Sequence, residues 1–469
     1  MGPPTITAEP GPLRSRLADR AVPLALVGAA GLAVVLAYQL GLPPVVLLLL
    51  AASPLALLFG YRLALPLLVI ALVARTVMDN SGNQLITGGI AIAIIGLAAL
   101  VLVRTPGWTA PVLAISAVLF ASAFAGASTH GGEYTYPEAL RLVSAMGIVV
   151  VVVNAPGHLT LRRVGHAIQA VVIVPALLAV LQLVTGTGGL NNGVMRSSGT
   201  LAHSNSAATL FALANLATLA LILDSNRRRW VHAGLLGVFL VAQVSTGSIG
   251  GLVTLVVMAV VYLASAAVRR ADRILLGLLG VALGLYAAST SRVGAQRFAE
   301  YSSDNTGGTS LDWRIHAWAS VLNAWRANPV LGNGTGSSQS PTILQGNIPH
   351  NEYVRLLAET GVVGLVAAVA LGLWVAARLR ARMRTAQHPA AAAFGLAVVT
   401  GLAVNALAAN TMLYTTSFYL GLFAIGACWR IAREDPAVET LPGAPGTGED
   451  RAPIGGRWVT DPDPKSPTR

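Results

Sequence analysis

Long apolar runs recur along most of this 469-residue chain and decide its fold class. A helix needs about 20 mostly apolar residues to cross a bilayer. Some runs are so closely spaced that two of them can form one bent helix. We therefore expect an all-α polytopic membrane protein with 12–14 transmembrane helices, from runs at 21–40, 43–60, 63–79, 85–103, 108–126, 138–155, 164–184, 205–224, 230–246, 249–267, 273–289, 355–376, 389–409 and 411–431.

The composition excludes several other classes of protein. Charged residues make up 11% of the chain, against roughly 25% in a soluble domain. A single cysteine, Cys428, allows neither a disulfide framework nor a cysteine metal site. The formal charge of +12 is not gathered into one basic face with interleaved aromatic residues, so we expect no nucleic-acid partner.

The arginines predict the orientation, because short cytoplasmic loops carry an excess of Lys and Arg. With a cytoplasmic N-terminus, 19 basic residues fall on the inner turns and only eight fall on the outer turns and span ends. We therefore expect both termini in the cytoplasm. The outer basic residues are Arg75, Arg141, Arg196, Arg292, Arg297, Arg314, Arg326 and Arg355.

This orientation divides the chain into five parts. Residues 1–20 form a cytoplasmic segment, 21–289 carry the first 11 helices, and 351–432 carry the last three. Residues 290–350 form a long extracytoplasmic loop. Residues 433–469 are rich in Pro, Gly, Asp and Glu and read as a disordered cytoplasmic tail.

The long loop contains a predicted amphipathic helix, from an N-cap at Asp312 to about Arg326, ended by Asn328-Pro329. Its Trp-edged apolar face suits the membrane interface. Arg314 lies within that face, so it snorkels to a headgroup, pairs with Asp312 or meets an anion. The apolar face comprises Ile315, Trp318, Val321, Leu322 and Trp325.

Three further segments on the outer side carry polar residues suited to an anion or a hydroxyl group. The glycines between Gly332 and Gly336 either present backbone amides to an anion or form an ordinary flexible loop. His350 precedes a membrane helix, where the helix dipole and Arg355 favour its neutral form and attract phosphate. Arg196 is either a snorkelling residue or a ligand for phosphate.

These segments together resemble the O-antigen ligase and polymerase superfamily of polytopic glycan-transfer enzymes. The matching stretches are Arg196…Gly199…His203-x-Asn205, then Trp313-Arg314…Trp318…Asn328-Pro329-Val-Leu-Gly332-x-Gly334, then His350-Asn351-Glu352-Tyr353…Leu357…Glu359-x-Gly361-Val-Val-Gly364. They cover about residues 185–375 in the expected order.

The resemblance implies a multi-span, lipid-dependent (GT-C-like) glycosyltransferase fold in the bacterial cytoplasmic membrane. The implied donor is a polyprenyl-diphosphate-linked glycan, and the acceptor is a hydroxyl group of a glycan or glycolipid on the outer face. Arg196 and Arg314 would hold the pyrophosphate, and His350 would deprotonate or position the hydroxyl. The remaining implied substrate-binding residues are His203, Asn205, Trp318, Asn351 and Arg355. Fixed arginines supply the positive charge, so we expect no metal and no cofactor.

The chain departs from the family pattern at two places. It reads His203-Ser204-Asn205 where many members have His-Pro-Asn, and Ser245-Thr246-Gly247 where many have Ser-Arg-Gly. Arg292 or Arg297 would have to replace the missing arginine. Ligation and polymerisation stay open, and so does transport, as in a lipid-linked oligosaccharide flippase. Transport would require ionisable groups near the midplane, which are scarce here.

Overall fold

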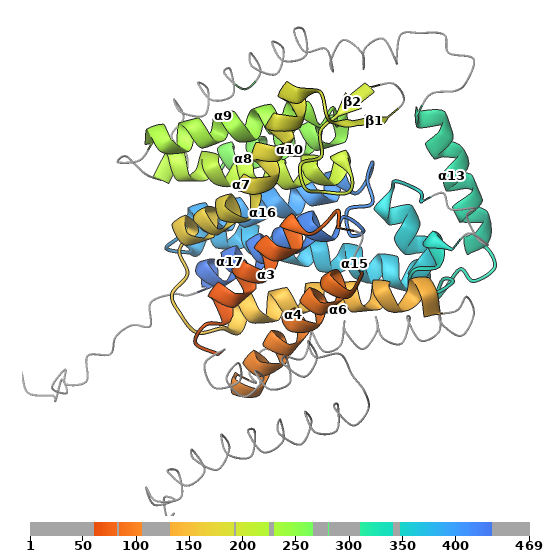
Figure 1. Ribbon diagram of the computed structural model, residues 1–469. Coiled ribbons are helices and arrows are strands. Elements are labelled where there is room, and N and C mark those ends of the chain that lie inside the picture. Colours follow the sequence, from red (N-terminus) through yellow and green to blue (C-terminus); the bar gives the residue numbers. More distant parts are fainter. Residues whose placement is uncertain are drawn as a thin grey trace, which may run out of the picture. The chain divides into compact units, whose positions relative to one another are not determined.

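A computed structural model describes residues 61–81, 84–105, 132–191, 194–224, 229–265, 280, 310–340 and 348–433. Within these residues the chain is predominantly helical, which confirms the expected all-α polytopic membrane protein (Figure 1). The α-helices are α3 (Ala64–Val77), α4 (Gln84–Arg104), α6 (Gly132–Asn154), α7 (Leu161–Thr185), α8 (Ser204–Asp224), α9 (Arg229–Ser245), α10 (Ile249–Leu263), α13 (Ser310–Trp325), α15 (Glu352–Thr385), α16 (Pro389–Asn405) and α17 (Thr415–Arg433).

Two smaller elements complete the described structure. Strands β1 (Gly189–Asn191) and β2 (Val194–Arg196) form an antiparallel hairpin in which Gly189 faces Arg196. A single 3₁₀ turn, η2 (Ser337–Gln339), follows the glycine-rich stretch. The hairpin lies directly before α8, so its last residue, Arg196, is held close to the start of that helix.

The helices follow the apolar runs closely. Five of them, α4, α6, α7, α8 and α15, are long and apolar enough to cross a membrane, and four shorter apolar helices lie between them. The predicted spans 21–40, 43–60, 108–126 and, except for residue 280, 273–289 lie outside the described residues. So do residues 1–20 and the tail from residue 434, which we expect in the cytoplasm.

The α8 helix lies at the centre of the packing, with nearly all of its residues buried. It packs against α7, α9, α10 and α17. Figure 1 shows α7, α9 and α10 beside it. Small residues allow this close approach: a Cβ on Gly251 would lie 2.3 Å from Ala208 Cβ. Such small-residue contacts are typical of helices packed within a membrane. By contrast, Ile70, Ile92, Val256 and Leu373 are exposed, as expected for side chains that face lipid.

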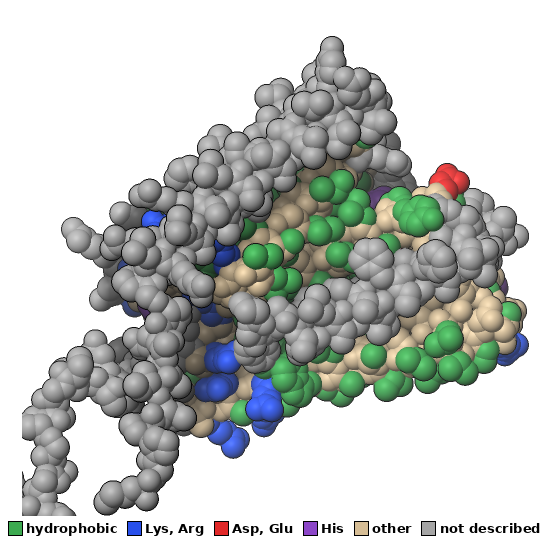
Figure 2. Space-filling model, turned by 90° about the horizontal axis from the view of Figure 1, so that it is seen from below, with side chains coloured by type: hydrophobic (Ala, Val, Ile, Leu, Met, Phe, Trp, Pro, Cys, Tyr) green, Lys and Arg blue, Asp and Glu red, His purple; other side chains and the backbone are tan. Residues whose placement is uncertain are grey.

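The two ends of the helices differ in their polar residues. In α7, α15 and α17 the predicted cytoplasmic ends carry arginines, among them Arg162, Arg384 and Arg430. Figure 2 shows most of the Lys and Arg side chains on one face gathered toward one end. The opposite ends of the same helices carry the residues of the candidate site. The alternation of charge in the sequence therefore corresponds to two distinct ends of the bundle.

Two boundaries differ from expectation. The α13 helix begins at Ser310, so Asp312 lies inside its first turn rather than at the N-cap. The α15 helix extends over 34 residues instead of the expected 355–376, and it is interrupted at Gly361, which has φ 65° and ψ −170°. A glycine within an apolar run gives no local signal for such a break, because glycine is tolerated inside membrane helices.

Candidate functional site

A cavity of about 620 Å³ lies at the end of the bundle opposite the arginine-rich turns. Its size falls within the roughly 300–1,000 Å³ of small-molecule sites. Four of the residues expected from the sequence line it: Arg196, His203, Asn205 and His350. The other four expected residues, Arg314, Trp318, Asn351 and Arg355, are not part of its lining.

Arg196 is fixed by the hairpin and by two neutral oxygen atoms. Its Nε donates to the carbonyl of Thr246 at 2.7 Å, and its Nη2 donates to Oδ1 of Asn205 at 2.7 Å. Thr246 belongs to the turn between α9 and α10, where the resemblance described above implies an arginine. This turn therefore contributes a backbone acceptor that orients Arg196.

The loop that joins Arg196 to His203 is held from both sides. Gln182 of α7 accepts hydrogen bonds from the amides of Ser198 and Gly199 and donates to the Gly199 carbonyl. Asp79 accepts one from the Ala202 amide at 3.1 Å. Gly199 has φ +62°, and a Cβ there would lie 2.2 Å from the carbonyl oxygen of Pro175. Only glycine fits, so the loop has one defined path.

His350 has an unusual backbone conformation. Its φ of +48° makes it the one non-glycine residue with positive φ in the described part of the chain. Non-glycine residues in this left-handed region are uncommon and concentrate at functional sites. The indole of Trp318 donates to the carbonyl of Pro349 at 2.5 Å and fixes the residue before it. Asn351, the residue after it, caps α15 by accepting from the amides of Tyr353 and Val354.

The imidazole of His350 is neutral at neutral pH. Burial, and then the positive charge of Arg314 and the nearby His203, lower its pKa from 6.5 to about 4. From the sequence we expect the helix dipole and Arg355 to favour this neutral form. In the structure the charged neighbour is instead Arg314, on a different helix.

Arg314 reaches this neighbourhood because α13 packs against the first turns of α15. Val321 of α13 and Ala358 of α15 are buried together, with Trp325 and Val354 around them. The expected apolar face of α13 therefore packs partly on protein, while Ile315 stays exposed. The side chain of Asp312, the other expected partner of Arg314, lies outside the described residues.

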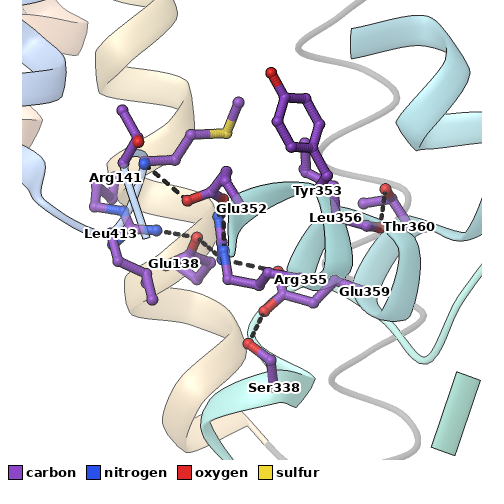
Figure 3. Close-up of polar contacts among 12 residues, drawn as sticks. Glu138, Arg141, Ser338, Glu352, Tyr353, Arg355, Leu356, Glu359, Thr360 and Leu413 are labelled. Carbon is purple, nitrogen blue, oxygen red and sulfur yellow. Dashed lines mark hydrogen bonds and ion pairs between the residues drawn. The ribbon is translucent and has the colours of Figure 1, made fainter. Parts of the chain in front are cut away.

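Arg355 has a quite different environment, shown in Figure 3. Its guanidinium is fully buried and meets three carboxylates: Glu138 at 2.9 Å, Glu352 at 2.5 Å and Glu359 at 3.0 Å. Glu138 belongs to α6 and also pairs with Arg141. The cluster therefore joins α6 to the beginning of α15. The expected phosphate-binding role of Arg355 stays a prediction.

The glycine-rich stretch caps the break in α15. The amides of Asn333 and Gly334 donate to the carbonyls of Ala358 and Glu359, and the amide of Val362 donates to Pro329. These bonds satisfy backbone groups that the break at Gly361 would otherwise leave without partners. From the sequence we expect this stretch either to present amides to an anion or to form a flexible loop. In the structure the amides of Asn333 and Gly334 are bonded to α15, so the loop is held in place.

Arg141, Asn410 and Tyr414 also line the cavity but are not among the site residues expected from the sequence. The sequence offered one indication for Arg141, because it is among the eight basic residues expected on the outer side. Asn410 and Tyr414 lie in the turn between α16 and α17, where the sequence shows only a short polar interruption. Their position in the cavity wall follows only from the packing of α16 and α17 beside α8 and α15.

A comparison with known protein families agrees with the resemblance that the sequence motifs indicate. The O-antigen ligase family matches residues 234–369, a segment that contains Arg314, His350 and Arg355. This match confirms the resemblance to the O-antigen ligase and polymerase superfamily. It supports an enzyme of ligase or polymerase type that acts on lipid-linked glycans in a membrane. No curated protein matches the chain.

Proposed function

We propose that the protein is a membrane glycosyltransferase that moves a glycan from a polyprenyl diphosphate to a hydroxyl group of a glycan or glycolipid. The observation that carries the proposal is one cavity lined by both Arg196 and His350, with the charge of Arg314 acting on His350. A fixed cation and a neutral imidazole are the two groups that such a transfer needs.

In the proposed reaction the acceptor oxygen attacks the anomeric carbon of the donor sugar. The bond between that carbon and the diphosphate oxygen breaks, and the electron pair leaves with the diphosphate. His350 takes the proton of the attacking hydroxyl, which requires the neutral imidazole. Arg196 and Arg314 stabilise the negative charge that develops on the leaving group. These cations supply the charge that a metal would otherwise supply, so we propose a reaction without metal or cofactor.

The other expected residues divide into two groups. His203 and Asn205 line the cavity, and we assign them to substrate binding. Trp318, Asn351 and Arg355 hold the backbone and the helix around His350, and we assign them to positioning. A bound diphosphate would place negative charge near His350 and raise its pKa, which would make it a stronger base when the donor is present.

We place the reaction on the outer face of the bacterial cytoplasmic membrane, with both termini in the cytoplasm. The cavity lies at the helix ends opposite the arginine-rich turns, which supports this orientation together with the positive-inside bias. Cysteine substitutions at exposed positions near each end test it. A membrane-impermeant thiol reagent applied to intact cells should label Ser81→Cys near the cavity but not Arg380→Cys at the other end.

The proposal is tested with purified protein in lipid, a polyprenyl-diphosphate-linked oligosaccharide and a glycan acceptor, with and without EDTA. His350→Asn is the informative variant, because asparagine tolerates the positive φ of this position but cannot act as a base. His316→Asn, on the exposed side of α13, is the matched control. We expect transfer in EDTA, a loss of about 10²–10⁴-fold in His350→Asn and little change in the control.

Full transfer by the His350→Asn variant would contradict the assigned base. Movement of labelled lipid across the bilayer without any transfer would favour a flippase. A product ladder of growing glycans would identify a polymerase, and a single addition would identify a ligase.

A further inference from the structure

Arg141 and Asn410 line one part of the cavity, and each has a buried polar atom to which the proposed transfer reaction assigns no role. In the part of the chain that the structure describes, the Oδ1 atom of Asn410 and the Nε atom of Arg141 are buried and have no hydrogen-bond partner. Both residues line the cavity, and Asn410 is only 1% exposed. A buried polar atom without a partner costs about 1–3 kcal/mol, so such an atom in a residue that lines a cavity points to a ligand.

The turn that carries Asn410 is held in place, although the Oδ1 atom of Asn410 has no hydrogen-bond partner among the described residues. Thr411 donates to Asn405, and Asn405 donates to Thr254 of α10, both at 2.9 Å. The amide of Met412 donates to Glu352 at 2.9 Å. The turn around Asn410 is therefore anchored to two neighbouring helices, and the amide is held in place before any ligand arrives. Such preorganisation is typical of a binding group.

The charge of this wall favours an uncharged ligand. Arg141 and Arg355 are the two cations of the buried cluster, and they face the three carboxylates of Glu138, Glu352 and Glu359. The cluster therefore offers no excess of positive charge to a further phosphate. It offers one N–H donor, at Arg141, and one carbonyl acceptor, at Asn410. A sugar hydroxyl group both donates and accepts hydrogen bonds, and it matches this pair.

We propose that Arg141 and Asn410 form a subsite for an uncharged pyranose, the sugar attached directly to the diphosphate of the donor. The assignment rests on the proposed function. Arg196, which holds the diphosphate in that proposal, lines the same cavity, so the group bound beside it is the sugar joined to the diphosphate. Asn410 then acts as a specificity-determining residue for the donor.

The test compares two lipids: polyprenyl diphosphate alone and the same lipid carrying a single N-acetylglucosamine, galactose or glucose. Dissociation constants are measured on the full-length protein in nanodiscs. For the wild type we expect at least one glycosylated lipid to bind about tenfold more tightly than the bare lipid, as about 1.4 kcal/mol of added hydrogen bonding would give. Asn410→Ala should lower this ratio toward one, because only the Arg141 donor then remains, and it should leave the affinity for the bare lipid unchanged.

The thermal stability of Asn410→Ala provides a second readout. Because the amide oxygen has no partner, its removal should leave the melting temperature unchanged or raise it, whereas loss of a structural residue would lower it. Asn80→Ala, which removes an exposed asparagine at the end of α3, is the matched control and should change neither quantity. Arg196→Gln should weaken the binding of bare and glycosylated lipids equally.

Two results would overturn the subsite. One is a wild-type protein that binds bare and glycosylated lipids equally well. The other is an Asn410→Ala variant that weakens both lipids equally or unfolds more easily. The proposed function fails differently: if the wild type does not bind bare polyprenyl diphosphate, the donor class itself is wrong.

Discussion

Arg196 and Arg355 are both buried arginines at the same end of the helices, yet their surroundings are opposite. Arg355 is fully buried and meets three carboxylates, whereas Arg196 is 7% exposed, lines the cavity and donates to two neutral oxygens. In the proposed orientation both arginines lie on the outer side, against the positive-inside bias. An arginine on the outer side therefore has two possible meanings, a structural cation or a cation for a ligand, and its partners decide between them.

The largest expected effect comes from Arg355→Met, which should prevent stable folding. It leaves the carboxylates of Glu352 and Glu359 buried without their cation, and breaking a buried ion pair costs about 3–5 kcal/mol. The yield of monodisperse protein and its melting temperature in detergent measure this. Arg380→Met, at the exposed opposite end of the same helix, is the control. A stable Arg355→Met variant with normal melting would remove the distinction between the two arginines.

The second effect concerns Arg196→Gln, which should fold but lose transfer. Removal of one group that stabilises transition-state charge typically lowers kcat by about 10²–10³-fold. The melting temperature should fall much less than for Arg355→Met, because the Thr246 carbonyl and the Asn205 amide oxygen, which lose a donor, are uncharged. Transfer rate and melting temperature measured on the same sample separate the two effects. Unfolding without a specific loss of transfer would place Arg196 in the same structural class as Arg355.

The smallest expected effect is a pH shift caused by Arg314→Gln. Burial is the largest cause of the lowered pKa of His350 and the charge of Arg314 is the second, so removal of that charge should raise the pKa from about 4 part of the way toward 6.5. A base must be unprotonated, so the residual transfer should be lost at a higher pH when the solution is acidified. Profiles of kcat/KM against pH show this shift. Arg326→Gln, at the end of α13, should leave the acid limb unchanged.

The sequence predicts the helices well because a bilayer imposes their length and their apolar character. The same constraint explains why ten of the predicted runs correspond to the described helices α3, α4, α6–α10 and α15–α17. It also predicts that Arg196, His203, Asn205 and His350 lie on one side, but not that they share a cavity. That requires the hairpin before α8 and the start of α15 to meet.

The carboxylate cluster could not be predicted from the sequence for a different reason. Arg355 and Glu138 are 217 positions apart, and no local pattern connects them. The i,i+3 and i,i+4 spacing of Glu352 and Glu359 relative to Arg355 was visible, but exposed pairs of this kind contribute little to stability. Only the burial of all the groups turns this spacing into a structural cluster. Asn410 likewise stands out only in the structure, where its buried Oδ1 atom has no hydrogen-bond partner among the described residues.

The break at Gly361 has a mechanical consequence for the site. A long membrane helix adjusts its tilt to the thickness of the bilayer. In an unbroken helix both ends would change direction together. In α15 the regular helix is interrupted at Gly361. The turns before the break, from Glu352 to Thr360, are fixed by contacts with α6, α13 and the loop 329–334. The lipid can therefore set the tilt of residues 362–385 without setting the direction in which His350 points.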